Sequence, residues 1–96
     1  MIRSFDNKVA RDIYHGENSK KARKLPKGLH PKARRLLDQL NAAPNIDFLR
    51  IPPGNRLEKL SGDLEGKWSI RINEQWRVVF TWEGVNAHDV AIVDYH

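Results

Sequence analysis

Apolar and polar side chains alternate along one stretch in the second half of this 96-residue chain. The alternation runs through residues 67–73, breaks at the polar pair Glu74 and Gln75, and resumes as far as Trp82. A period of two residues is typical of a β-strand with one buried face, and the polar break predicts a hairpin between two such strands. The apolar side of this hairpin carries Trp68, Ile70, Ile72, Trp76, Val78, Phe80 and Trp82.

Three further strands are predicted around this hairpin. The apolar run at residues 90–93 has no polar interruption, which predicts a last strand that is central and covered on both faces. Residues 57–60 follow a Pro-Pro-Gly-Asn turn and predict a short strand, and residues 2–5 predict an opening strand. The three tryptophans share their side with Ile and Val, so we interpret them as core residues beneath helices rather than as base-stacking platforms.

Helical patterns occupy the first half of the chain. Pro31 suits a first helical position and Pro44 stops the pattern, which predicts an amphipathic helix between them. Its apolar stripe is Ala33, Leu36, Leu37, Leu40 and Ala43. Before it, Asp6 or Asn7 caps a predicted helix that ends at Gly16 and buries Val9, Ala10, Ile13 and Tyr14. Residues 17–30 have few apolar anchors and predict a mobile basic connection.

The predicted order is one strand, two helices and then four strands, and the length of the chain suits a single domain over residues 1–96. We therefore predict an α+β fold. Two N-terminal helices pack on one face of an antiparallel-rich sheet of about four or five strands. An active site is expected on the other face.

Positive charge is concentrated in one segment. The chain has 17 Lys and Arg against 12 Asp and Glu, a formal net charge of +5. No acidic residue lies between Glu17 and Asp38, where eight cations occur: Lys20, Lys21, Arg23, Lys24, Lys27, Lys32, Arg34 and Arg35. This asymmetry predicts a polyanionic partner, nucleic acid first, and the alternative is a solvated helix face with a loop. No apolar run suits a membrane span or a signal peptide, so we expect a cytoplasmic protein without a membrane partner.

The chain lacks the residues that several classes of chemistry require. The chain has no Cys, its four His show no ligand-like spacing, and it has no Gly-rich phosphate loop. We therefore expect no metal site and no cofactor. Acid–base cleavage of RNA remains, which needs a base, a cation for the phosphorane and an acid for the leaving 5′-oxygen. Asp94, Tyr95 and His96 follow the last predicted strand and can supply an acid or base; the alternative is a polar exposed tail.

Four motifs together resemble a known family. They are the opening MIRSF, the run PPGNRLEKL from residue 52, the stretch LSGDLEGKWSIRINEQWRVVFTW over residues 60–82, and the ending VDYH. In this order and spacing they resemble the RelE superfamily of bacterial toxins, and specifically its HigB branch. The resemblance is strong at residues 1–5 and 52–96, and across the helices it rests on length and element order.

The resemblance implies a microbial RNase-like fold and a ribosome-dependent, metal-independent endoribonuclease that cuts messenger RNA. It also implies a HigA-like helix-turn-helix antitoxin as partner, with operator DNA bound only through that antitoxin. Arg77 matches the arginine that stabilises the scissile phosphate, and the alternation independently places it opposite the Trp stripe. His96, with Tyr95, matches the pair that supplies the general acid and positions the nucleotide, and Asp94 matches an acidic position of the HigB type.

The identity of the general base stays open between two carboxylates. Glu58 coincides with the base of the YoeB branch, whereas some HigB relatives carry His at that position and Lys in place of Ser61. The base is therefore Glu58 or Asp94. Arg77 is then the main residue that stabilises the charge on the scissile phosphate, and Arg71 and Lys59 are further RNA or ribosome contacts.

Two other functions are compatible with the same fold. A toxin that resembles ParE would bind DNA gyrase and lack a ribonuclease set, and Arg77 with the Asp-Tyr-His ending argues against it. A basic RNA-binding module without catalytic activity would bind RNA through its cations alone. For the ribonuclease, we assign the basic segment, residues 20–35, to contact with ribosomal RNA.

Overall fold

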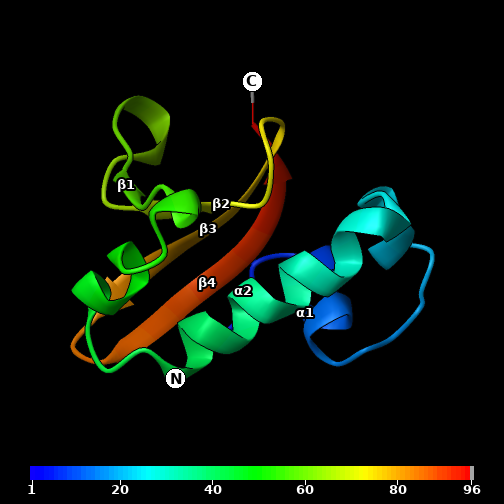
Figure 1. The fold of residues 1–96 in the computed structure, drawn as a ribbon, viewed down its shortest axis with the longest axis horizontal. Helices are drawn as coiled ribbons and strands as arrows, with labels where there is room; N and C mark the ends of the chain where they lie inside the picture. Colours follow the sequence, from blue (N-terminus) through cyan, green and yellow to red (C-terminus); the bar gives the residue numbers. More distant parts are fainter. Residues whose placement is uncertain (96) are drawn as a thin grey trace.

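A four-stranded sheet and two α-helices make up the computed structural model, which describes residues 1–95 (Figure 1). The helices are α1, Lys8–Tyr14, and α2, His30–Ala42. The strands are β1, Glu58–Lys59; β2, Trp68–Arg71; β3, Trp76–Glu83; and β4, Asn86–Asp94. Their order in the sheet is β1-β2-β3-β4 and each neighbouring pair is antiparallel, which confirms the α+β class and the antiparallel sheet.

Helix α2 supplies the largest block of the core. Its Leu36, Leu37 and Leu40 are buried in one cluster with the inward residues of β2 and β3, among them Ile70 and Phe80. These positions follow the predicted stripe, and the helix ends at Ala42, before Pro44. Each buried Leu side chain stabilises the fold by about 1.5–3 kcal/mol through removal from water.

The three tryptophans of the sheet lie at the margin of this core. Trp68, Trp76 and Trp82 are half-buried and pack against the buried cluster. Their interpretation as core residues is confirmed in part, because they pack against the core without being fully buried in it. Their alternation in register also means that the residues between them face the other side of the sheet.

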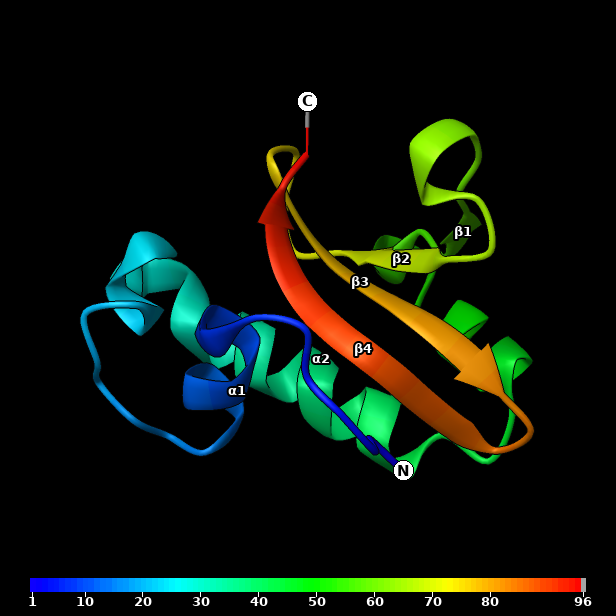
Figure 2. The ribbon, with the colours of Figure 1, turned by 180° about the vertical axis from the view of Figure 1, so that it is seen from behind.

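The strand β4 lies at the edge of the sheet, so its predicted central position is wrong. Its residues Val90 and Ile92 are nevertheless buried, because they lie in the core cluster with the residues of the helices. The N-terminal segment covers the outer edge of the strand. This segment is not the predicted strand: it makes two isolated parallel bridges, Ile2 to Ala87 and Phe5 to Val90. Figure 2 shows it running along β4. An apolar run indicates that a strand is buried, which does not require a central position in the sheet. Here the edge of β4 is covered by a segment that is distant in the sequence.

Asn7 joins the N-terminal segment to α1. Its Oδ1 atom accepts from the Ala10 amide at 3.0 Å, which confirms the predicted cap of α1. Its side-chain amide also donates to the Ile92 carbonyl at 2.9 Å, and Oδ1 accepts from the Ile92 amide at 3.3 Å. The side chain thus extends the hydrogen bonding of the β4 edge by one more residue.

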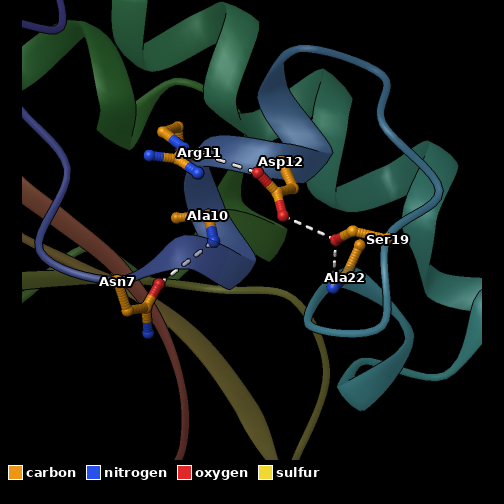
Figure 3. Close-up of polar contacts among 6 residues, drawn as sticks. All are labelled: Asn7, Ala10, Arg11, Asp12, Ser19 and Ala22. Atoms are coloured by element: carbon orange, nitrogen blue, oxygen red, sulfur yellow. Dashed lines mark hydrogen bonds and ion pairs between the residues drawn. The ribbon is translucent and has the colours of Figure 1, made fainter.

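The connection between the helices is better anchored than predicted. Ala22 and Leu25 are completely buried, and short 3-10 helices form at Ala22–Lys24 and Lys27–Leu29. The buried Asp12 carboxylate accepts from the Ser19 hydroxyl at 2.5 Å, and Ser19 Oγ accepts from the Ala22 amide at 3.0 Å (Figure 3). The prediction of a connection with few apolar anchors is therefore wrong in this part, because two apolar residues and one buried carboxylate suffice to fix it.

Two further 3-10 helices, at Ile46–Arg50 and Pro53–Asn55, lie between α2 and β1, and a third, at Gly62–Leu64, lies between β1 and β2. Within residues 1–95, no helix has the length and apolar character needed to cross a membrane.

Candidate active site

Two arginines face each other across the β2–β3 hairpin. Arg71 and Arg77 are Cα partners in the antiparallel register. The next pair is hydrogen-bonded, with the Ile72 amide donating to the Trp76 carbonyl at 3.0 Å, so the arginine pair occupies the narrower, non-hydrogen-bonded position, where Cα atoms approach to about 4.5 Å. Like charges directly opposite one another destabilise a sheet, and an anion bound between them would relieve that repulsion.

The Arg77 guanidinium is held by neutral groups. Its Nη1 atom donates to the carbonyl oxygens of Asn73 and Trp76, the latter at 3.2 Å, and its Cζ atom lies 5.4 Å from the centre of the Tyr95 ring. Within residues 1–95 no carboxylate pairs with Arg77, whereas Arg71 lies 3.8 Å from the exposed Glu74 carboxylate. The Arg77 side chain is therefore fixed in place while its charge is not neutralised by these residues.

The end of β4 lies beside the β2–β3 turn. The Tyr95 amide donates to the Gln75 carbonyl at 2.6 Å, and Gln75 Nε2 donates to Asp94 Oδ2 at 3.0 Å. Arg77 is the sheet partner of Val93, so the alternation of β4 places Tyr95 on the Arg77 side and Asp94 on the opposite side, as partner of Trp76. The structure thus places Tyr95 beside Arg77 and the Asp94 side chain on the opposite face of the sheet.

The register also separates the two predicted residues of β1. Glu58 is the partner of Ser69, which shares a face with Arg71, so the exposed Glu58 carboxylate lies on the arginine face. Lys59 is the partner of Trp68 and lies on the opposite face, with Nζ 5.7 Å from the centre of the Trp68 ring. Of the two carboxylates considered as a base, Glu58 is therefore the one that shares the arginine face.

The floor of this face is small and buried. Ser69, Val79 and Ala91 are sheet partners in one row, and all three are buried although Val79 and Ala91 lie outside the main core cluster. This row continues from Glu58 across the sheet and lies beside the row of Arg71 and Arg77, on the same face of the sheet. We name the surface formed by Glu58, Arg71, Arg77 and Tyr95 the arginine face.

Two residues of this region had no predicted role. Asn73 shapes the turn that holds Arg77, and Gln75 joins that turn to the end of β4. Asn before a tight turn is a local signal that could have identified Asn73. Gln75 pairs with a residue 19 positions away, and no local pattern indicates such a contact. His96, the predicted acid, lies outside the described residues.

The basic segment precedes and begins α2, so it belongs to the helical layer. Its cations are exposed apart from Lys32, which is half-buried. Arg34 Nε donates to the Ile13 carbonyl at 3.3 Å, and Arg23 Nη1 donates to the Asn18 carbonyl at 2.8 Å. No ion pair within residues 1–95 involves any of the eight cations.

A shallow depression of about 410 Å³ lies at the start of α1, lined by Phe5, Asp6, Asn7, Lys8 and Arg11. None of these residues belongs to the arginine face. Across residues 1–95, no three His, Asp or Glu side chains gather as they would around a metal ion.

Comparison with known proteins identifies the family. Residues 3–96 match the HigB-like toxin family, described as the RelE-like toxin of the type II toxin-antitoxin system HigB. The chain belongs to this family. It is 42% identical to Toxin HigB-1 of Vibrio cholerae over 82 residues, which cover 85% of this chain and 84% of the relative. The resemblance predicted from the sequence is thereby confirmed.

Other relatives are more distant. The chain is 39% identical to Endoribonuclease HigB of Proteus vulgaris over 41 residues, which cover 43% of this chain and 45% of that protein. A solved YoeB–YefM complex from Staphylococcus aureus contains a chain with the same fold, with a TM-score of 0.60 at 22% identity and coverage of 100% of this chain and 98% of that chain. This last similarity supports the RelE-like fold.

Proposed function

We propose that this HigB-like toxin is an endoribonuclease that cuts messenger RNA in the decoding site of the ribosome and thereby inhibits translation and growth. The observation that carries the proposal is the Arg71–Arg77 pair, two cations in adjacent strands on one face with the Tyr95 ring against the second. A phosphodiester is an anion whose charge increases in the transition state, so it is the ligand that such a pair best stabilises. Family membership supports the same activity.

The reaction proposed is an attack by the 2′-hydroxyl of the message itself. The base takes the 2′-hydroxyl proton, the 2′-oxygen forms a bond to phosphorus, and the bond from phosphorus to the 5′-oxygen breaks. Glu58 is the base that the register favours over Asp94, because it shares the arginine face. Arg77 holds the phosphorane, Tyr95 orients the nucleotide, and His96 protonates the leaving oxygen. The products are a 2′,3′-cyclic phosphate and a 5′-hydroxyl.

The partners proposed are the ribosome, the message and an antitoxin. The exposed cations of the basic segment suit ribosomal RNA, and the contact they make should weaken steeply with salt. A HigA-like helix-turn-helix protein neutralises the toxin, and operator DNA is bound through that protein. A toxin that acts on ribosomes works in the cytoplasm.

Expression of the toxin in a growing culture tests this proposal. We expect cleavage of messages at translated codons, with 5′-hydroxyl ends on the downstream fragments, and no cleavage with Arg77→Ala. Cut messages with 5′-phosphate ends would contradict the mechanism. Broken or supercoil-locked DNA with intact messages would indicate a gyrase toxin instead.

A further inference from the structure

The turn between β2 and β3 is built around one asparagine. Asn73 Oδ1 accepts from the Gln75 amide at 2.9 Å and from the Trp76 amide at 2.8 Å. The backbone carbonyl of the same residue accepts from Arg77 Nη1. The Asn73 side chain therefore fixes the turn, and its carbonyl holds the guanidinium.

The same turn holds the end of β4. The Gln75 carbonyl accepts from the Tyr95 amide at 2.6 Å, and Gln75 Nε2 donates to Asp94 Oδ2 at 3.0 Å. Figures 1 and 2 both show this turn beside the end of β4, from opposite directions. Five hydrogen bonds at Asn73 and Gln75 thus connect the shape of the turn to the placement of Arg77 and Tyr95.

We propose that Asn73 and Gln75 are positioning residues that hold the Arg77 guanidinium and the Tyr95 ring in one relative arrangement on the arginine face. Arg77 Cζ lies 5.4 Å from the centre of the Tyr95 ring, and each of these two groups is bound to the β2–β3 turn. The catalytic consequence rests on the proposed ribonuclease function, whereas the arrangement itself does not. Misplacement of a reacting contact by about 1 Å can cost 10²-fold in rate, so such a device has a measurable effect.

The location of the turn distinguishes positioning from stability. Gln75 is exposed and Asn73 is half-buried, and neither belongs to the core cluster. Substitutions here should therefore change the melting temperature little. They should lower kcat more than they raise KM, because the basic segment that we assign to ribosome contact lies in the helical layer.

The experiment uses Asn73→Ala, Gln75→Ala and the conservative Asn73→Asp, which keeps an acceptor oxygen. Asn86→Ala is the matched control, since Asn86 lies at the other hairpin turn and its side chain makes no hydrogen bond within residues 1–95. Amide hydrogen exchange at Tyr95 is measured by NMR on the toxin alone. Cleavage of a translated message is measured in a reconstituted translation reaction.

Asn73→Ala should raise Tyr95 amide exchange and lower kcat, each by about tenfold, the effect of a lost hydrogen bond. Gln75→Ala should raise Tyr95 amide exchange and lower kcat by about threefold each. Asn73→Asp should leave both the exchange rate and kcat close to their wild-type values. Unchanged exchange in Asn73→Ala and Gln75→Ala would overturn the proposal. Faster exchange with undiminished kcat would overturn the positioning role. A wild-type toxin that cleaves no message would instead overturn the proposed function, while the exchange data still decide whether the turn holds Tyr95.

Discussion

Two charged regions of this toxin are built in opposite ways. The Asp12 carboxylate is buried and accepts hydrogen bonds from Ser19 and Arg11. The Arg77 guanidinium is half-buried, is held by carbonyls and a ring, and has no carboxylate partner within residues 1–95. A charge whose partners are internal stabilises the fold, whereas a fixed charge without such a partner is suited to an external ion of opposite sign.

The position of each region fits this division. Asp12 fixes the connection between the helices through Ser19, and none of its contacts reaches the sheet. Arg77 lies opposite a second arginine, an arrangement that costs stability in the absence of an anion. Substitutions in the first region should therefore change stability, and substitutions in the second should change activity.

The largest effect is expected for Arg77→Ala. Loss of a preorganised contact to the transition state typically lowers a rate by about 10²–10³-fold, and we expect this loss in cleavage of translated messages. The melting temperature should change little, because the guanidinium bonds only to backbone carbonyls near the surface. Arg50→Ala, which breaks only an exposed pair with Asp47, is the control and should retain full activity. A large fall in melting temperature for Arg77→Ala would assign this residue a structural role.

Asp12→Asn should lower stability without affecting the chemical step. The Ser19 hydroxyl, and more weakly Arg11, hold the pKa of Asp12 below its usual value against the opposing effect of burial. A lowered folded-state pKa means that the stabilisation is complete above the unfolded pKa of about 4 and is lost as the pH falls through the folded value. Thermal unfolding between pH 7 and pH 2 should therefore show a shallower loss of stability in acid for Asp12→Asn than for the wild type. Parallel curves for the two proteins would refute this assignment.

Arg71→Ala should lower cleavage activity and at the same time raise the stability of the fold. We expect about a tenfold loss of cleavage, from one weakened contact to the phosphate. Removal of the facing like charge should at the same time stabilise the sheet by roughly 0.2–1 kcal/mol in the absence of RNA. Denaturant unfolding at low salt measures this gain. A loss of stability instead would show that Arg71 contributes more through its packing or its pair with Glu74 than it costs through repulsion.

Ser19→Ala should have a local effect on the fold rather than an effect on cleavage. It removes the hydrogen bond to Asp12 and the cap on the Ala22 amide, which together should cost about 1–2 kcal/mol. The loss should be local, so trypsin should cut the connection at Lys20–Lys24 faster in the folded variant than in the wild type. Asn18→Ala is a suitable control, because only the backbone carbonyl of Asn18 is used in this region. Equal cutting rates would show that Ala22 and Leu25 anchor the connection unaided.

The sequence predicted those parts of the fold that depend on local periodicity. The alternation around Ile70 and Val78 predicted the hairpin and the face of Arg77, and the stripe through Leu37 predicted α2. The place of β4 in the sheet was not predictable in this way. An apolar run shows that a strand is buried, not that it is central: Val90 and Ile92 lie in the core beneath the helices. The edge of β4 is covered by residues 1–7, which lie more than 80 positions away in the sequence.

The placement of the candidate site residues was predictable to the same extent. Arg77 and Tyr95 were identified from motifs, and the structure brings them together. The separation of Asp94 and Lys59 from the arginine face depends on register, which is set by pairing between strands. The contact from Gln75 to Asp94 likewise forms only when β3 and β4 pair.

The central claim is that the arginine face holds the scissile phosphate. The most direct measurement is a cryo-EM structure of the toxin on a ribosome whose message carries a single 2′-deoxynucleotide at the cut position, so that the complex cannot react. We expect Arg77 nitrogens within about 2.7–3.2 Å of an oxygen of that phosphate, with the Tyr95 ring beside the same nucleotide. A message bound instead along the basic segment, with Arg77 facing solvent, would contradict it.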